Sequence, residues 1–262
     1  MDGTQVTVVA LHGNGGGLSS FAPVRERMAP DVRFRPVTLP GFGLRPVDRR
    51  LDSAAGYAER LRDQLAPEPS PLVVLGHGVG ASLVLELLQR RPVTVAGAIL
   101  HAPVGAPRDE RPERRLLRLP GAAPLTRRAI SSRLTRPVAR RALLADWSRD
   151  RAGPGEGAGD AAGRADRLLD GYRHCAVFAQ MPDIVDAEWF AGLEPVDLPA
   201  VLLWGERERC PGTDAVGDYL RLLPRGRART VPGWGRFPMV AHPAGYAAEV
   251  ASLARGLVGA AV

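Results

Sequence analysis

The sequence contains no lysine, only two cysteines and few aromatic residues, and each scarcity narrows the class of protein. All 35 basic residues are arginine, and with 28 acidic residues they give a formal net charge of +7. Two cysteines, Cys175 and Cys210, are too few for a disulfide framework and suit a reducing compartment. The first residues lack the basic n-region of a signal peptide, so we expect a cytoplasmic protein.

Long hydrophobic runs are also absent, although 45% of the 262 residues are hydrophobic. No apolar run reaches the roughly 18 residues that a transmembrane helix needs, so we expect no membrane partner. No spacing of histidine, cysteine and acidic residues matches a metal-ligand set, and the sequence predicts no metal ion and no cofactor. The length is sufficient for one α/β core with an inserted segment.

Positive charge is concentrated in residues 108–151, which hold 13 arginines against five acidic residues. An acidic partner, such as a carrier protein that presents the substrate, can dock on such a stretch. Nucleic acid is a poorer match, because the stretch lacks interleaved aromatic residues and no groove-reading motif accompanies it. A solvated helical face is the plainer interpretation, and it stays open beside the acidic partner.

Apolar runs alternate with helical patterns along most of the chain, which is typical of an α/β fold with a parallel sheet and crossover helices. We expect strands at residues 6–11, 32–39, 72–75, 95–100, 200–204 and 228–231. We expect helices at residues 20–28, 54–65, 81–91, 214–222 and 243–257.

The regular alternation breaks at residues 106–195, and this stretch predicts an inserted helical cap. Residues 1–105 and 196–262 then form a single core. Inside the cap, the Gly-rich piece at 151–163 cannot bury apolar surface, so it predicts a mobile loop.

The segment Leu72–Leu85 predicts a strand, a sharp turn and a helix, which is the context of a nucleophile elbow. That elbow carries the pattern G-x-S-x-G, whereas Gly76–Gly80 reads G-H-G-V-G. Glycine at position 78 removes the attacking hydroxyl. Two consequences stay open: Gly78 relaxes a turn that forces φ above zero, or it opens space for a substrate or a water.

Five stretches together resemble proteins of the α/β-hydrolase fold that carry a helical cap. They are Leu11–Gly16, Leu39–Gly43, Gly76–Gly80, Leu202–Glu208 and Pro232–Phe237. The resemblance implies a sheet of about six mainly parallel strands flanked by helices. It also implies a catalytic triad in the chain order nucleophile, acid, histidine.

The triad positions that this resemblance assigns are Gly78, Glu208 and Arg236, so the nucleophile and the base are both missing. Glutamate is an acceptable acid, but arginine stays charged near neutral pH and cannot shuttle a proton. We therefore expect no serine-type hydrolysis. In one interpretation Glu208 and Arg236 pair with each other; in the other, Arg236 points into the pocket and holds a carboxylate or enolate oxygen.

The resemblance further implies an oxyanion hole made by the backbone N–H groups of Asn14 and Val79, with Gly13 and Gly78 beside the substrate. Such donors stabilise an enolate as well as a tetrahedral intermediate. Enolate chemistry needs a base but no covalent nucleophile, and this links the site to lyase or cyclase reactions.

Two histidines are candidate bases for such chemistry. His101 ends a strand, and we expect its side chain to face the crevice at the strand ends. His77 precedes the elbow position. A structural role is the alternative for both, and it is the preferred interpretation for His12 and His242.

Three functions follow from these residues. The first is a cofactor-independent lyase or cyclase of secondary metabolism that acts on a small, partly apolar, carboxylate-bearing molecule with His101 or His77 as base. The second is a hydrolase in which a histidine activates water. The third is a pseudo-hydrolase that binds a ligand without chemistry.

Overall fold

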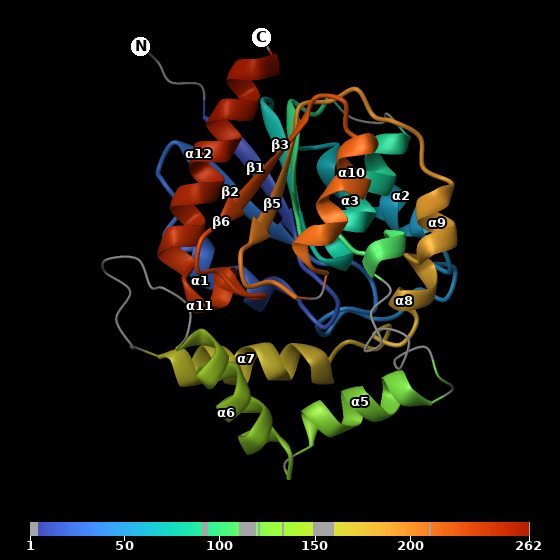
Figure 1. Cartoon of the computed structure of the whole chain (residues 1–262), viewed down its shortest axis with the longest axis vertical. Helices are drawn as coiled ribbons and strands as arrows, with labels where there is room; N and C mark the ends of the chain where they lie inside the picture. Colours follow the sequence, from blue (N-terminus) through green and yellow to red (C-terminus); the bar gives the residue numbers. More distant parts are fainter. Residues whose placement is uncertain are drawn as a thin grey trace.

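The computed structural model describes residues 5–90, 94–109, 119, 121–132, 134–148, 160–209 and 211–261. In these residues the strands are β1 (Val6–Leu11), β2 (Val32–Val37), β3 (Leu72–His77), β4 (Gly97–His101), β5 (Ala200–Gly205) and β6 (Gly226–Val231). All pair in parallel and form one sheet in the order β2-β1-β3-β4-β5-β6 (Figure 1). The predicted α/β-hydrolase architecture of about six mainly parallel strands is confirmed.

The strands differ in burial according to their place in the sheet. Every residue of β1, β3, β4 and β5 is buried, as their continuous apolar, β-branched runs predict for strands covered on both faces. The edge strand β6 is half exposed and places Arg227 and Arg229 on the surface. Charged side chains on an edge strand oppose pairing with another chain.

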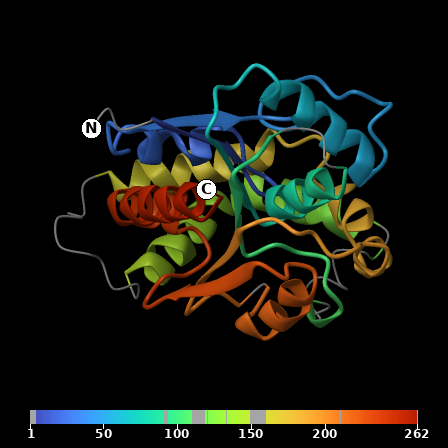
Figure 2. The ribbon, with the colours of Figure 1, turned by 90° about the horizontal axis from the view of Figure 1, so that it is seen from above.

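Helices cover both faces of this sheet. One face carries α1 (Ala22–Arg25), α11 (Pro238–Ala241) and α12 (Pro243–Ala261), and the other carries α2 (Ala54–Leu65), α3 (Val79–Gln89) and α10 (Val216–Arg221). Figure 2 shows α12 and the α2–α3 pair on opposite sides of the strands. Each layer contributes to its own apolar cluster, so the sheet separates two cores.

The predicted helices agree with these elements except at their ends. The helix expected at residues 20–28 is a short 3-10 turn, η1 (Leu18–Ser20), followed by the four-residue α1.

No helix of the described residues is long and apolar enough to cross a membrane.

Between β4 and β5 lies a helical insertion, by which we mean the described residues from η2 (Pro107–Asp109) to Ala191. Its helices are α5 (Ala122–Ser131), α6 (Arg136–Trp147), α7 (Ala161–Arg173), α8 (Met181–Ile184) and α9 (Ala187–Ala191). In Figure 1, α5, α6 and α7 form a layer across the carboxyl ends of the strands. The division into a core and a separate cap domain at residues 106–195 stays a prediction.

The expected mobile loop at 151–163 is wrong at its C-terminal end. Residues 161–163 form the first turn of α7, because Gly163 lies among the helix-forming alanines that open the segment. Residues 151–159 lie outside the described residues.

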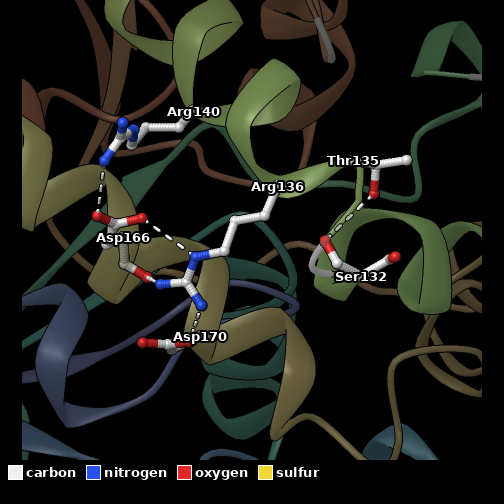
Figure 3. Close-up of polar contacts among 6 residues, drawn as sticks. All are labelled: Ser132, Thr135, Arg136, Arg140, Asp166 and Asp170. Atoms are coloured by element: carbon white, nitrogen blue, oxygen red, sulfur yellow. Dashed lines mark hydrogen bonds and ion pairs between the residues drawn. The ribbon is translucent and has the colours of Figure 1, made fainter.

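Ion pairs join α6 to α7 inside the insertion (Figure 3). The Arg136 guanidinium reaches Asp166 at 3.1 Å and Asp170 at 2.6 Å, and Arg140 reaches Asp166 at 3.3 Å. These arginines belong to the basic stretch of the sequence, so part of its positive charge is neutralised within the fold.

The insertion packs directly on two glycine turns of the core. A Cβ on Gly15 would overlap the Tyr172 ring, and a Cβ on Gly41 would overlap Val177. Ala176 donates its backbone N–H to the Gly41 carbonyl at 2.9 Å. Both glycines also have positive φ, so the turns require glycine for conformation and for contact.

Candidate functional site

The elbow between β3 and α3 keeps the backbone geometry of a nucleophile turn. Gly78 has a φ of +55° and donates its N–H to the His101 carbonyl at 2.9 Å. The neighbouring glycines are fixed by contact: a Cβ on Gly76 would lie 2.5 Å from the Ala81 backbone, and one on Gly80 would lie 2.6 Å from the Leu11 carbonyl oxygen.

Position 78 itself is open. A Cβ placed on Gly78 would have Gly13 Cα, at 3.8 Å, as its nearest neighbour beyond the adjacent residues. A side chain there meets ordinary van der Waals contact and no obstruction. A side chain at this position would therefore fit without displacing its neighbours.

A small cavity lies over this open position. Its volume is about 40 Å³, and its lining includes Gly13, Asn14, His77, Gly78, Val79 and Arg236. A water molecule in the liquid takes roughly 30 Å³, so the space admits about one water or the oxygen end of a carbonyl group.

The turn that supplies the oxyanion position is held by the helical insertion. Asn14 Nδ2 donates to the Phe178 carbonyl at 3.0 Å, and Asn14 Oδ1 accepts a long contact of 3.7 Å from Cys175 Sγ. The side chain of Asn14 is thus engaged with the helical insertion, and Asn14 and Val79 both line the cavity. This link could not be predicted from the sequence, because residues 14 and 175 are far apart in the chain.

His77 is the only histidine beside His12 that lines this cavity among the described residues. Its imidazole packs against the oxyanion turn, since a Cβ on Gly13 would lie 2.8 Å from His77 Nδ1. Burial, followed by the nearby His101 and Arg236, lowers the pKa of His77 well below its usual value. The ring is therefore neutral at pH 7, and it is a weak base.

His101 does not face the strand-end crevice, and that expectation is wrong. Its side chain is completely buried, and its Nδ1 lies 3.1 Å from the Tyr246 hydroxyl of α12. It contacts the His77 ring at a centroid distance of 4.8 Å and does not line the cavity. Burial lowers the pKa of His101 to about 3. The side chain points toward the sheet face that α12 covers.

Glu208 and Arg236 form the ion pair that one interpretation of the sequence expects. Arg236 Nη1 lies 3.5 Å from Glu208 Oε1, and the same oxygen accepts the Arg209 backbone N–H at 2.9 Å. The Glu208 side chain is 2% exposed and that of Arg236 is 39% exposed. The Arg236 guanidinium also stacks 5.6 Å from the Phe237 ring centre. The two residues to which the resemblance assigns the acid and histidine positions are therefore held in an ion pair.

The remaining histidines of the core lie where a structural role predicts. His12 Nδ1 contacts the Gly13 carbonyl oxygen at 2.9 Å and packs against Phe42, and burial lowers its pKa to about 4. His242 is buried at the start of α12. Within the described residues, no group of three or more histidine, cysteine or acidic side chains is placed to hold a metal ion.

The buried histidines make the stability depend on pH in a definite direction. His101 has a native pKa of about 3, whereas the unfolded chain takes up the proton near 6.5. As pH falls from 7 to 5, the unfolded state gains a proton that the native state refuses, so stability decreases by about 2 kcal/mol for this group. We therefore expect the free energy of unfolding, measured with urea, to depend less on pH in His101→Phe. Between pH 7 and pH 5 the variant should lose about 2 kcal/mol less stability than wild type.

His174 supplies the matched control, because its side chain is exposed on the insertion. His174→Gln should follow the wild-type pH dependence. Equal pH dependence of wild type and His101→Phe would contradict a lowered native pKa at His101.

Comparison with known proteins supports the α/β-hydrolase fold of this chain. The model of the Alpha/beta hydrolase family matches residues 8–249. The chain is 26% identical over 266 aligned positions to a pimeloyl-[acyl-carrier protein] methyl ester esterase of Aromatoleum aromaticum, and the match covers 95% of this chain and 98% of that protein.

Two solved structures show the same fold. An N-formylmaleamic acid deformylase of Pseudomonas putida superposes with a TM-score of 0.71 at 17% identity, covering 95% of this chain and 92% of the other. The RedJ thioesterase of prodiginine biosynthesis in Streptomyces coelicolor gives a TM-score of 0.60 at 20% identity, covering 95% and 86%. From the match of the family model, this chain belongs to the Alpha/beta hydrolase family.

Proposed function

We propose that this chain is a non-acylating member of its family, which binds the carbonyl end of an acyl compound without turning it over. The observation that carries the proposal is the Glu208–Arg236 ion pair beside Gly78, which fills the acid and histidine positions of a triad that has no nucleophile. An acyl-enzyme cannot form without an attacking side chain at position 78.

The histidines do not replace the missing base. A general base works best when its pKa lies near the working pH, and burial lowers the pKa of both His77 and His101 far below neutrality. His101 in addition has no access to the cavity. This favours the third of the functions considered from the sequence over the first two.

The remaining features of the cavity over Gly78 are suited to binding a ligand. Asn14 and Val79 line one cavity, and Val79 begins the 11-residue helix α3. Free N–H groups at the start of a helix favour a partially negative oxygen. A carbonyl oxygen in the space over Gly78 fits both the size and the polarity of the cavity.

The test uses acetyl-N-acetylcysteamine, a small thioester, as the probe. We expect ligand-observed NMR to show binding, with no acid released over hours and no deuterium incorporated next to the carbonyl in heavy water. Gly78→Ala places a methyl group in the cavity and should weaken binding at least 10-fold. Ser19→Ala, at an exposed position outside the cavity lining, is the matched control.

Other outcomes of the same experiment identify the other functions. Deuterium incorporation that His77→Gln abolishes would support the cofactor-independent lyase or cyclase, which the position of His77 in the cavity lining favours as the second candidate. Release of acid carrying labelled solvent oxygen, again lost in His77→Gln, would support attack by histidine-activated water. Either result would overturn binding without chemistry.

We further propose that an acidic acyl carrier protein presents the ligand in the cytoplasm, with the helical insertion as its docking face. The relatives named above include an esterase of an acyl-carrier-protein ester and a biosynthetic thioesterase. On the insertion, Arg127, Arg128 and Arg173 surround a hollow of about 510 Å³ that no acidic residue lines. Arg136 and Arg140 lie on the same insertion outside this hollow, and the α7 aspartates neutralise their charges.

Docking of this kind depends on salt and on the arginines that line the hollow. We expect the dissociation constant for an acylated carrier protein to rise at least 10-fold between 50 and 300 mM salt, because surface charges are screened. Arg128→Gln combined with Arg173→Gln should weaken binding by a similar factor, while Arg140→Gln should not. An affinity that is independent of salt would contradict the docking proposal.

A further inference from the structure

A cavity far larger than the one over Gly78 lies elsewhere in the described residues. It has a volume of about 640 Å³, against about 40 Å³ over Gly78. Small-molecule sites are commonly concave spaces of roughly 300–1,000 Å³. The larger cavity lies at the sheet edge, between the carboxyl end of β2, the turn at 43–45, η1 and α7. We name it the β2-edge cavity.

Apolar side chains form one part of its lining and are exposed to solvent. Leu18 is 57% exposed and Leu44 is 85% exposed, and both line the cavity together with Pro36 and Val37. A large apolar side chain that is left in water at a concave site marks a place where a ligand can bury it. Burial of such surface stabilises a complex by roughly 25 cal/mol per Å².

The charged lining of the β2-edge cavity is predominantly basic. Arg35 pairs with Glu68, Arg167 pairs with Asp160, and the single acidic residue of the lining, Asp170, pairs with Arg136. These charges are therefore already compensated within the fold.

Arg45 is different from these arginines. Its side chain is exposed on the turn next to Leu44, and it has no acidic partner among the described residues. An uncompensated guanidinium beside exposed leucines complements a ligand with a carboxylate head and an apolar chain, because arginine binds a carboxylate through two parallel hydrogen bonds.

We propose that the β2-edge cavity binds an amphipathic carboxylate, with its chain against Leu18 and Leu44 and its head group at Arg45. This site is separate from the cavity over Gly78 and does not depend on the function assigned to that cavity. The two cavities share no lining residue, although η1 and α7 border both: Ser19 and Arg167 line one, and Ser20 and Leu168 line the other.

The test measures decanoate binding by isothermal titration calorimetry, with decanol and acetate as probes that lack the charge and the chain. We expect decanoate to bind at least 10-fold more tightly than either. Arg45→Gln and Leu44→Ser should each weaken decanoate at least 5-fold, and both positions are exposed, so the variants should fold as wild type. Arg49→Gln is the matched control, because Arg49 is an exposed arginine of the same loop that does not line the cavity.

Three results would overturn the proposal. If decanol binds as tightly as decanoate, Arg45 does not bind the head group. If Arg45→Gln and Arg49→Gln lose equal decanoate affinity, the effect of Arg45 is only that of positive charge in this loop. Decanoate binding that Gly78→Ala abolishes would place the ligand over the elbow instead. Retention of decanoate affinity in Gly78→Ala, with loss in Arg45→Gln, supports the assignment.

Discussion

Combining Gly78→Ser with Arg236→His should give this chain serine-hydrolase activity. The expected gain is at least about 100-fold in kcat/KM for p-nitrophenyl acetate over either single variant, since triad members act as a unit. The scaffold already supplies the other parts: a Cβ on Gly78 meets nothing nearer than 3.8 Å, and the elbow has the positive φ of a nucleophile turn. Glu208 is buried where a triad acid belongs.

The activity of the double variant is compared with that of the two single variants and of a variant with a third substitution. Gly78→Ser alone has a nucleophile without a base, and Arg236→His alone has a base without a nucleophile, so each should stay near the uncatalysed rate. Adding Glu208→Gln to the double variant should reduce the rate again, because the imidazole loses its charged partner. A fluorophosphonate probe should label only variants that carry serine at position 78.

A folded double variant that neither hydrolyses the ester nor reacts with the probe would contradict the geometric assignment of position 78. It would mean that the space over the elbow does not bring the new hydroxyl and imidazole together. Circular dichroism of the same preparation separates this result from misfolding.

The sheet could be predicted from the sequence because its strands are short apolar runs with glycine or charge at each end. The limits predicted for the first strand, residues 6–11, and for the helix at 54–65 agree with β1 and α2 as observed. Disagreements are small and occur at strand and helix ends, where local propensity does not decide the last residue. The described residues between β4 and β5 are helical where the alternation breaks after residue 105, and the division into core and cap stays a prediction.

Only those parts of the candidate site whose residues lie in one turn or one strand could be predicted from the sequence. The elbow and the pairing of Glu208 with Arg236 follow from motif positions. The side-chain direction of His101 did not, because a strand-end residue can turn toward either neighbouring layer, and here it contacts Tyr246, 145 residues later in the chain. The strand alone does not specify which layer supplies a hydrogen-bond partner.

The sizes of the two cavities could not be predicted from the sequence either, because they depend on contacts between distant segments. Leu168 of α7 and Val240 of α11 close the space over Gly78, while η1 and the turn at 43–45 leave the β2-edge cavity open. No pattern along the chain indicates that the family's usual site is nearly filled and that a second concave site is larger. Tertiary packing decides it.

Gly80→Ala should be the most destabilising single change in the elbow, although it adds only one methyl group. A Cβ at this position would overlap the His12 carbonyl oxygen and lie 2.6 Å from that of Leu11. Both acceptors belong to backbone at the end of β1, the central strand next to β3, which cannot move without disturbing the sheet. We expect a loss of at least about 3 kcal/mol and a decrease in Tm of roughly 6–12 °C, measured by urea and thermal unfolding.

Gly78→Ala separates this steric effect from the effect of backbone conformation. Its new Cβ has open space, so the cost is limited to the positive φ of +55°, about 1 kcal/mol. The two substitutions are chemically identical and lie two residues apart, and the structure predicts that they differ at least threefold in lost stability. Equal losses would show that conformation alone, rather than close contact between β1 and α3, requires the glycines of the elbow.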